Sequence, residues 1–120
     1  MERDQLGSGG GLDLESALAR VGGDLDLLKE ISRVFLDDCP RSLAEIRDAA
    51  ARVDYVVVER AAHGLKGASS NFGASRVVSA ALYIEQLGRG QKLDEFAPAF
   101  DALEAALAAL CSELEALLDS

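Results

Sequence analysis

The strongest periodic pattern in the chain lies in its last quarter. Apolar residues recur there in alternating steps of four and three, the spacing that places side chains on one face of an α-helix. Pro98 falls in the first turn of this segment, where its missing N–H leaves no hydrogen bond unmade. The pattern therefore predicts a long amphipathic helix with this apolar stripe: Phe96, Phe100, Leu103, Leu107, Leu110, Leu114 and Leu117.

A second long stripe precedes the middle of the chain. Asp24 is a suitable N-cap for it, because a short acidic side chain can accept a hydrogen bond from the first free N–H groups of a helix. Pro40 removes one backbone donor, but the stripe keeps its phase on both sides, so the sequence predicts a kink near Asp37 to Pro40 and no termination. The apolar positions are Leu28, Ile31, Phe35, Cys39, Leu43, Ile46 and Ala50.

Three shorter segments also show helical spacing, and glycines follow each of them, as they often follow helix C-termini. These segments run from about Leu12 to Val21, from Asp54 to Asn71 and from Ser75 to Leu87, where Gly88 and Gly90 are expected to stop the last one. Four long helices with short connections predict an all-α, antiparallel four-helix bundle. The short additional N-terminal helix is expected to pack across one end of it.

The first eleven residues differ in composition from the rest. They include Gly-Ser-Gly-Gly-Gly, which buries no apolar surface and loses much entropy on ordering. Residues 1–11 are therefore interpreted as a flexible linker or a remnant of cloning, and residues 12–120 as one domain with a single core. Alanine and leucine dominate and the chain has no Trp, which favours helix over sheet.

Charge and composition exclude several classes of partner. Twelve Lys and Arg against 21 Asp and Glu give a formal net charge of −9, which argues against nucleic acid. No apolar run approaches the roughly 20 residues that span a bilayer, so no membrane segment is expected. Cys39 and Cys111 lack CxxC spacing and lie at inward helical positions, which favours a reduced, cytoplasmic setting. With one histidine, no metal site is expected, and the domain is expected to be a monomer.

The candidate chemistry lies on the helix predicted after Asp54. At about 100° per residue, a core face forms there, and His63 points about 150° away from it, toward solvent. The core face contains Val58, Ala61, Ala62, Leu65, Ser69 and Phe72. An exposed imidazole keeps its nucleophilic nitrogen accessible.

Small and basic residues surround His63 on the same helical face. Lys66 and Gly67 follow at i+3 and i+4, Ser70 at i+7, and Gly64 lies beside them. Each glycine inside a helix costs about 1 kcal/mol relative to alanine, so two next to the histidine indicate close approach by another protein. The Lys66 ammonium is placed to stabilise the oxygens of a phosphoryl group on His63.

The segment from Ala62 to Ala74 resembles the signature His-x-Leu-Lys-Gly-x-Ser-x-x-x-Gly of histidine-containing phosphotransfer domains. The match is ungapped, and the resemblance extends from about residue 12 to 118, including Leu87-Gly88-Arg89. It implies that His63 carries a phosphoryl group on the ring nitrogen distal to the backbone.

The same resemblance assigns roles to the neighbours of His63. It implies that Lys66 is the electrostatic partner of the phosphoryl group and that Gly67 clears space for a docking protein, with Gly64 and Ser70 on the same surface. In some relatives a polar residue on the following helix orients the imidazole. Glu85 and Gln86 both remain candidates for that role.

The implied function is a reversible phosphorelay. A receiver domain's aspartyl phosphate loads His63, and a second receiver takes the group away, with a hybrid histidine kinase also among the partners. Because the chain lacks a nucleotide-binding loop and a carboxylate cluster for Mg²⁺, it is expected to be a carrier without its own cofactor, and Mg²⁺ belongs to the receiver.

Two other classes of helical protein are alternatives to a phosphotransfer domain. The dimerising phosphoacceptor domain of a histidine kinase shows a Glu and a Pro shortly after its histidine, where this chain has Gly64 and Leu65. A bundle that docks a signalling partner without being phosphorylated stays open as the alternative. Phosphate incorporation distinguishes it from a carrier.

Overall fold

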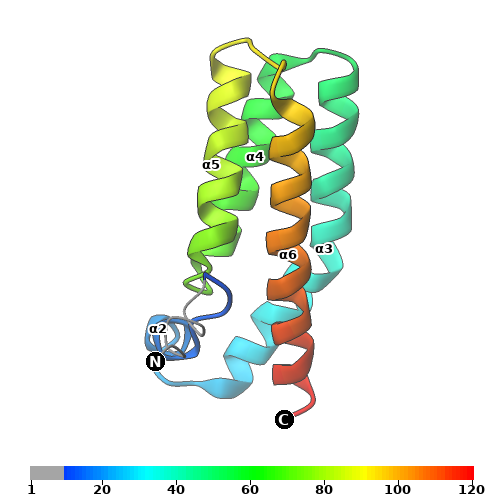
Figure 1. The fold of residues 1–120 in the computed structure, drawn as a ribbon. Coiled ribbons are helices and arrows are strands. Elements are labelled where there is room, and N and C mark those ends of the chain that lie inside the picture. Colours follow the sequence, from blue (N-terminus) through cyan, green and yellow to red (C-terminus); the bar gives the residue numbers. More distant parts are fainter. Residues whose placement is uncertain (1–9) are drawn as a thin grey trace, which may run out of the picture.

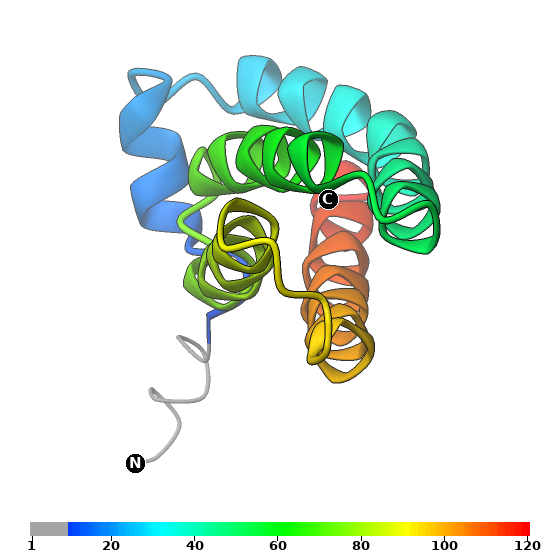
Figure 2. The same cartoon turned by 90° about the horizontal axis from the view of Figure 1, so that it is seen from above.

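The computed structural model describes residues 10–120, which form five helices and no strand. The helices α3, α4, α5 and α6 run alternately up and down as an antiparallel bundle, and α2 lies across one end of it (Figures 1 and 2). Their bounds are Leu14–Arg20 for α2, Leu25–Ala51 for α3, Tyr55–Ser70 for α4, Ser75–Arg89 for α5 and Phe96–Leu118 for α6. The predicted fold class is therefore confirmed.

Each helix of the bundle packs against the next one along the chain, and α6 packs back against α3. This order closes a ring in which α4 lies diagonally opposite α6. Aspartates begin three of the helices: the side chain of Asp24, for example, accepts a hydrogen bond from the N–H of Leu27 at 3.0 Å. Asp13 and Asp54 cap α2 and α4 in the same way.

Pro40 lies inside α3 without ending it. The helix runs over 27 residues and changes direction along its course, as Figure 1 shows. This is the behaviour predicted from a stripe that keeps its phase across a proline. Of that stripe, Leu28, Phe35, Cys39 and Ile46 are buried.

The core consists of the apolar stripes predicted from the sequence. On α6, every stripe residue from Phe100 onward is buried, and Phe96 is half-buried. On the α4 side, five of the six predicted core residues are buried and Ala61 is half-buried; the buried ones are Val58, Ala62, Leu65, Ser69 and Phe72. The rotation of α4 that the sequence predicted is thus the one observed.

Gly88 does not stop the third long helix, contrary to the sequence-based expectation. The α5 helix continues through it to Arg89. Gly88 is buried, and a Cβ atom there would lie 2.8 Å from the backbone nitrogen of Glu59 on α4. Its missing side chain therefore permits close packing of α4 and α5, and the helix gains the turn that carries Arg89.

Most of the predicted linker, residues 1–9, lies outside the described residues. Gly10 is buried, and its carbonyl accepts a hydrogen bond from the N–H of Arg76 at 3.1 Å. The N–H of Leu12 donates to Glu113 Oε1 at 2.7 Å. Gly10 thus already contacts the bundle, although it lies two residues before the predicted boundary. Within the described residues, no helix is long and apolar enough to span a membrane.

Candidate functional site

His63 lies in the second half of α4 with 66% of its side chain exposed. Its neighbours in sequence, Ala62 and Leu65, point into the core and fix the rotation of the helix. The imidazole therefore stands on the outer surface of a helix that is held from behind by buried residues. This agrees with the orientation predicted from the helical spacing.

The Glu85 carboxylate orients the imidazole from the neighbouring helix α5. Its side chain is only 3% exposed, and Oε2 lies 3.0 Å from Nδ1 of His63. An ionised carboxylate can only accept hydrogen bonds, so Nδ1 carries the proton and donates a hydrogen bond to Glu85. The other ring nitrogen, Nε2, then holds the free lone pair.

Two cations compensate the buried charge of Glu85. The Lys66 ammonium lies 2.7 Å from Oε1, and the Arg89 guanidinium donates a hydrogen bond to Oε2 at 2.8 Å. The ion pair with Lys66 holds the pKa of Glu85 below its usual value; burial opposes this shift and the hydrogen bond from His63 supports it. Glu85 is therefore ionised at neutral pH.

Arg89 also connects the site to a second carboxylate on α4. Its Nε donates to Glu59 Oε2 at 2.8 Å. Its guanidinium thus bridges Glu59 and Glu85, and it joins α4 and α5 beside His63. Arg89 was not predicted from the sequence to take part in the site; the signal that points to it is its i+4 spacing from Glu85.

The structure separates the two candidates for orienting the imidazole. Glu85 is buried and contacts His63, whereas Gln86 lies at an exposed position of α5. Adjacent residues on a helix point about 100° apart, so only one of them can face α4.

The glycines beside His63 leave open space above α4. A Cβ atom built at Gly64 or at Gly67 would meet no atom within 4 Å outside the helix itself. Ser70 is half-buried, and its hydroxyl donates to the carbonyl of Gly67 at 2.7 Å, so it is directed along its own helix. His63, Gly64, Gly67 and Ser70 are called the His63 face below.

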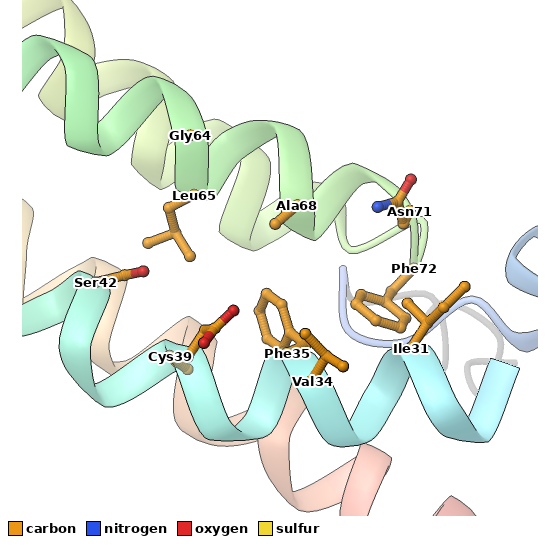
Figure 3. A pocket seen from close by; sticks show the side chains of 11 residues that line it. Ile31, Val34, Phe35, Cys39, Ser42, Gly64, Leu65, Ala68, Asn71 and Phe72 are labelled. Atoms are coloured by element: carbon orange, nitrogen blue, oxygen red, sulfur yellow. The ribbon is translucent and has the colours of Figure 1, made fainter.

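A groove between α3 and α4 borders this face. It has a volume of about 390 Å³ and includes Gly64 of the His63 face. Figure 3 shows Phe35 and Val34 of α3 facing Leu65 and Ala68 of α4 across it. Val34 is 57% exposed and adds apolar surface to the edge of this groove.

A second hollow, of about 400 Å³, lies on the other side of His63, between α4 and α5. Two arginines, Arg60 and Arg89, and the imidazole itself line it. Among residues 10–120, no group of three or more His, Cys, Asp and Glu side chains is arranged to hold a metal ion.

Comparison with known families agrees with this geometry. The model of the Hpt domain family matches residues 30–118, which is most of the chain. The chain belongs to the Hpt domain family. As an Hpt domain it is a histidine-containing phosphotransfer carrier of a phosphorelay, and this membership implies response-regulator receiver domains as partners.

Solved structures share the Hpt fold at low sequence identity. Histidine-containing phosphotransfer protein B from Pseudomonas aeruginosa PAO1 is 20% identical and superposes with a TM-score of 0.86, covering 93% of this chain and 97% of its own. The HPT domain of a sensor hybrid histidine kinase from Shewanella is 22% identical, with a TM-score of 0.78 and coverage of 90% and 93%. No curated protein sequence matches the chain significantly.

Proposed function

We propose that His63 is the residue of this Hpt domain that carries the phosphoryl group, accepting it from a receiver aspartate and passing it to another receiver. The observation that carries the proposal is the pairing of His63 with the buried Glu85 carboxylate, 3.0 Å from Nδ1. This contact fixes the tautomer in which Nε2 is the nucleophile. The exposed ring leaves that nitrogen open to a partner.

The transfer step follows from these contacts. Nε2 attacks the phosphorus of the aspartyl phosphate, the N–P bond forms, and the O–P bond breaks to release the aspartate carboxylate. The ring gains positive charge while Nδ1 keeps its proton, and Glu85 stabilises that charge through the existing hydrogen bond. The reverse step loads the second receiver by the same path.

Lys66 and Arg89 have different electrostatic roles in this proposal. The Lys66 ammonium forms a 2.7 Å ion pair with Oε1 of Glu85, and its side chain is 25% exposed. In this proposal Lys66 leaves that pair and turns toward the phosphoryl oxygens when His63 becomes phosphorylated. Arg89, held by Glu59, continues to compensate the buried carboxylate when Lys66 turns away.

The receiver docks on the His63 face and the adjoining α3–α4 groove. The open space at Gly64 and Gly67 allows an approaching backbone to come near the imidazole, and the apolar groove with Val34 offers surface to bury.

In this proposal the receiver supplies Mg²⁺, the chain has no nucleotide site of its own, and a hybrid histidine kinase stands upstream. The domain acts as a cytoplasmic monomer.

The test is transfer of label from a phosphorylated receiver domain. Wild-type protein should become labelled, and His63→Gln should not, while both show the same helicity and nearly the same melting temperature, because the ring is exposed. A labelled His63→Gln variant would exclude His63 as the acceptor. Binding of the receiver without label in the wild type would instead favour the non-phosphorylated docking module.

A further inference from the structure

The two cysteines of the chain meet across the contact between α3 and α6, on helices other than those that hold His63 and Glu85. Cys39 and Cys111 are 72 positions apart in sequence, and their Sγ atoms lie 3.9 Å apart. Both are free thiols. No other cysteine occurs in the sequence, so each has one possible partner within the chain.

The two thiols differ in access to solvent. Cys39 is 5% exposed, whereas Cys111 is half-buried. A hollow of about 480 Å³ between α3 and α6 is lined by both cysteines and by Pro40 and Leu107. A small solute can therefore reach Cys111 from this hollow, with Cys39 directly behind it.

The two thiols also differ in acidity. Hydrogen bonding by the Cys39 thiol lowers the pKa of Cys111, although burial acts against this shift. The same contact and burial raise the pKa of Cys39. Because the thiolate is the nucleophile and Cys111 is the more exposed of the two thiols, we expect Cys111 to react first and Cys39 second.

We propose that Cys39 and Cys111 form a reversible dithiol–disulfide couple that a hydroperoxide oxidises, cross-linking α3 to α6. The Cys111 thiolate attacks one peroxide oxygen, the O–O bond breaks, and Cys111 becomes a sulfenic acid while the other oxygen leaves as water or an alcohol. The Cys39 sulfur then attacks Cys111 Sγ, forming the S–S bond and releasing the sulfenic oxygen as water with the Cys39 proton. With hydrogen peroxide, two thiols lose two electrons and two water molecules form.

Disulfide formation requires the two sulfurs to move closer. They must approach from 3.9 Å to about 2 Å, by rotation of the two side chains and a shift of the packed helices. Any thiol-based reductant reverses the reaction by exchange. The couple does not depend on phosphotransfer, so its test and that of the His63 assignment are separate.

The experiment treats the full chain with a small excess of hydrogen peroxide and then alkylates the remaining thiols under denaturing conditions. Wild-type protein should lose both alkylatable thiols, remain a single chain on a non-reducing gel, and decrease in mass by two hydrogen atoms. Peptide mapping should link Cys39 to Cys111, and dithiothreitol should restore both thiols. The oxidised protein should melt at a higher temperature, because the cross-link restricts the unfolded chain across 72 positions.

Single variants test the order of the steps. Cys39→Ser should stop at a Cys111 sulfenic acid that dimedone traps, because the second thiol is absent. Cys111→Ser should slow the oxidation of Cys39 by about tenfold or more, since that thiol is buried and weakly acidic. Three results in the wild type would overturn the proposal. The first is oxidation of Cys111 to a sulfinic acid while Cys39 stays alkylatable, and the second is a disulfide between two chains. The third is that the protein loses no thiols under conditions in which free glutathione is oxidised.

Discussion

At the scale of single residues, the site depends on one buried carboxylate. Glu85 is 3% exposed, yet it contacts His63, Lys66 and Arg89. A buried charge is tolerated only when it is paired, and here two cations and one hydrogen-bond donor share two oxygen atoms. The arrangement holds the imidazole by a hydrogen bond while the carboxylate stays ionised.

Lys66→Ala tests the electrostatic role of the ammonium. We expect slower transfer to His63 or a less persistent phosphohistidine, because the phosphoryl oxygens lose one neighbouring cation. The Lys66 side chain is 25% exposed and pairs with a buried group, so the free energy of unfolding should fall by about 1 to 2 kcal/mol. Lys92→Ala, at an exposed position, is the matched control. Transfer kinetics equal to wild type in Lys66→Ala would remove Lys66 from the mechanism.

Glu85→Gln tests the buried carboxylate through its pH dependence. The pKa of Glu85 is lowered in the folded protein, so its ionised form stabilises the fold above the unfolded pKa of about 4.3 and this stabilisation is lost as pH falls through the folded value. Urea unfolding at pH 7 and at decreasing pH should show a larger loss on acidification in the wild type than in Glu85→Gln.

Glu30→Gln, an exposed carboxylate on α3, provides the control for that series and should keep the wild-type acid response. The variant Glu85→Gln should also be less stable than the wild type at pH 7, because Lys66 and Arg89 lose their charged partner. Parallel acid curves for wild type and Glu85→Gln would contradict the assigned role of the carboxylate.

Some features of single residues could be predicted from the sequence, and others could not. The exposure of His63 followed from the 3.6-residue period, because the core face of its own helix is visible in the apolar pattern. The choice between Glu85 and Gln86 did not follow, since it depends on how α5 is rotated against α4. The contact of Arg89 with Glu59 depends on the same packing and on a helix end that the sequence placed too early.

At the scale of helices, glycine has two different uses on facing elements. Gly88 lets the backbone of α5 approach that of α4, and a Cβ atom there would lie 2.8 Å from a backbone nitrogen. Gly67 touches no neighbouring helix at all. A glycine inside a helix with nothing packed against it indicates space kept for a partner, because helix propensity alone disfavours it.

Gly67→Gln separates docking from packing. The variant should gain up to about 1 kcal/mol in helix propensity and melt at the same or a higher temperature, while its transfer rate from a receiver falls because the side chain obstructs approach. Thermal melts and transfer rates are measured on the same samples. A clearly lowered melting temperature would contradict the placement of the His63 face.

Two comparison variants complete the Gly67 experiment. Ala109→Gln adds the same side chain at an exposed position of α6, diagonally opposite α4, and should leave transfer unchanged. Gly88→Ala should lower the melting temperature, because its methyl group collides with the α4 backbone. Ala109→Gln reports the effect of an added side chain on transfer, and Gly88→Ala reports the effect of a packing defect on the melting temperature.

At the scale of the whole molecule, the bundle holds the His63 imidazole on the outer surface of a helix packed from behind. The molecule measures 41 × 32 × 21 Å, with α4 and α5 adjacent and α6 diagonal to α4 (Figure 2). The helix pattern and the position of Pro40 were sufficient to predict this architecture, since amphipathic stripes of this length have few ways to pack. The meeting of Cys39 and Cys111 was not predictable, because it joins residues 72 positions apart.

The most direct test of the central claim is ¹⁵N NMR of the imidazole before and after phosphorylation. The chain has one histidine, so its two ring nitrogens give unambiguous signals. In the free protein we expect Nδ1 to be protonated and Nε2 to carry the lone pair, and after transfer we expect coupling to phosphorus at Nε2 with Nδ1 still protonated. Phosphorus on Nδ1, or label in the protein with an unchanged imidazole spectrum, would contradict the account.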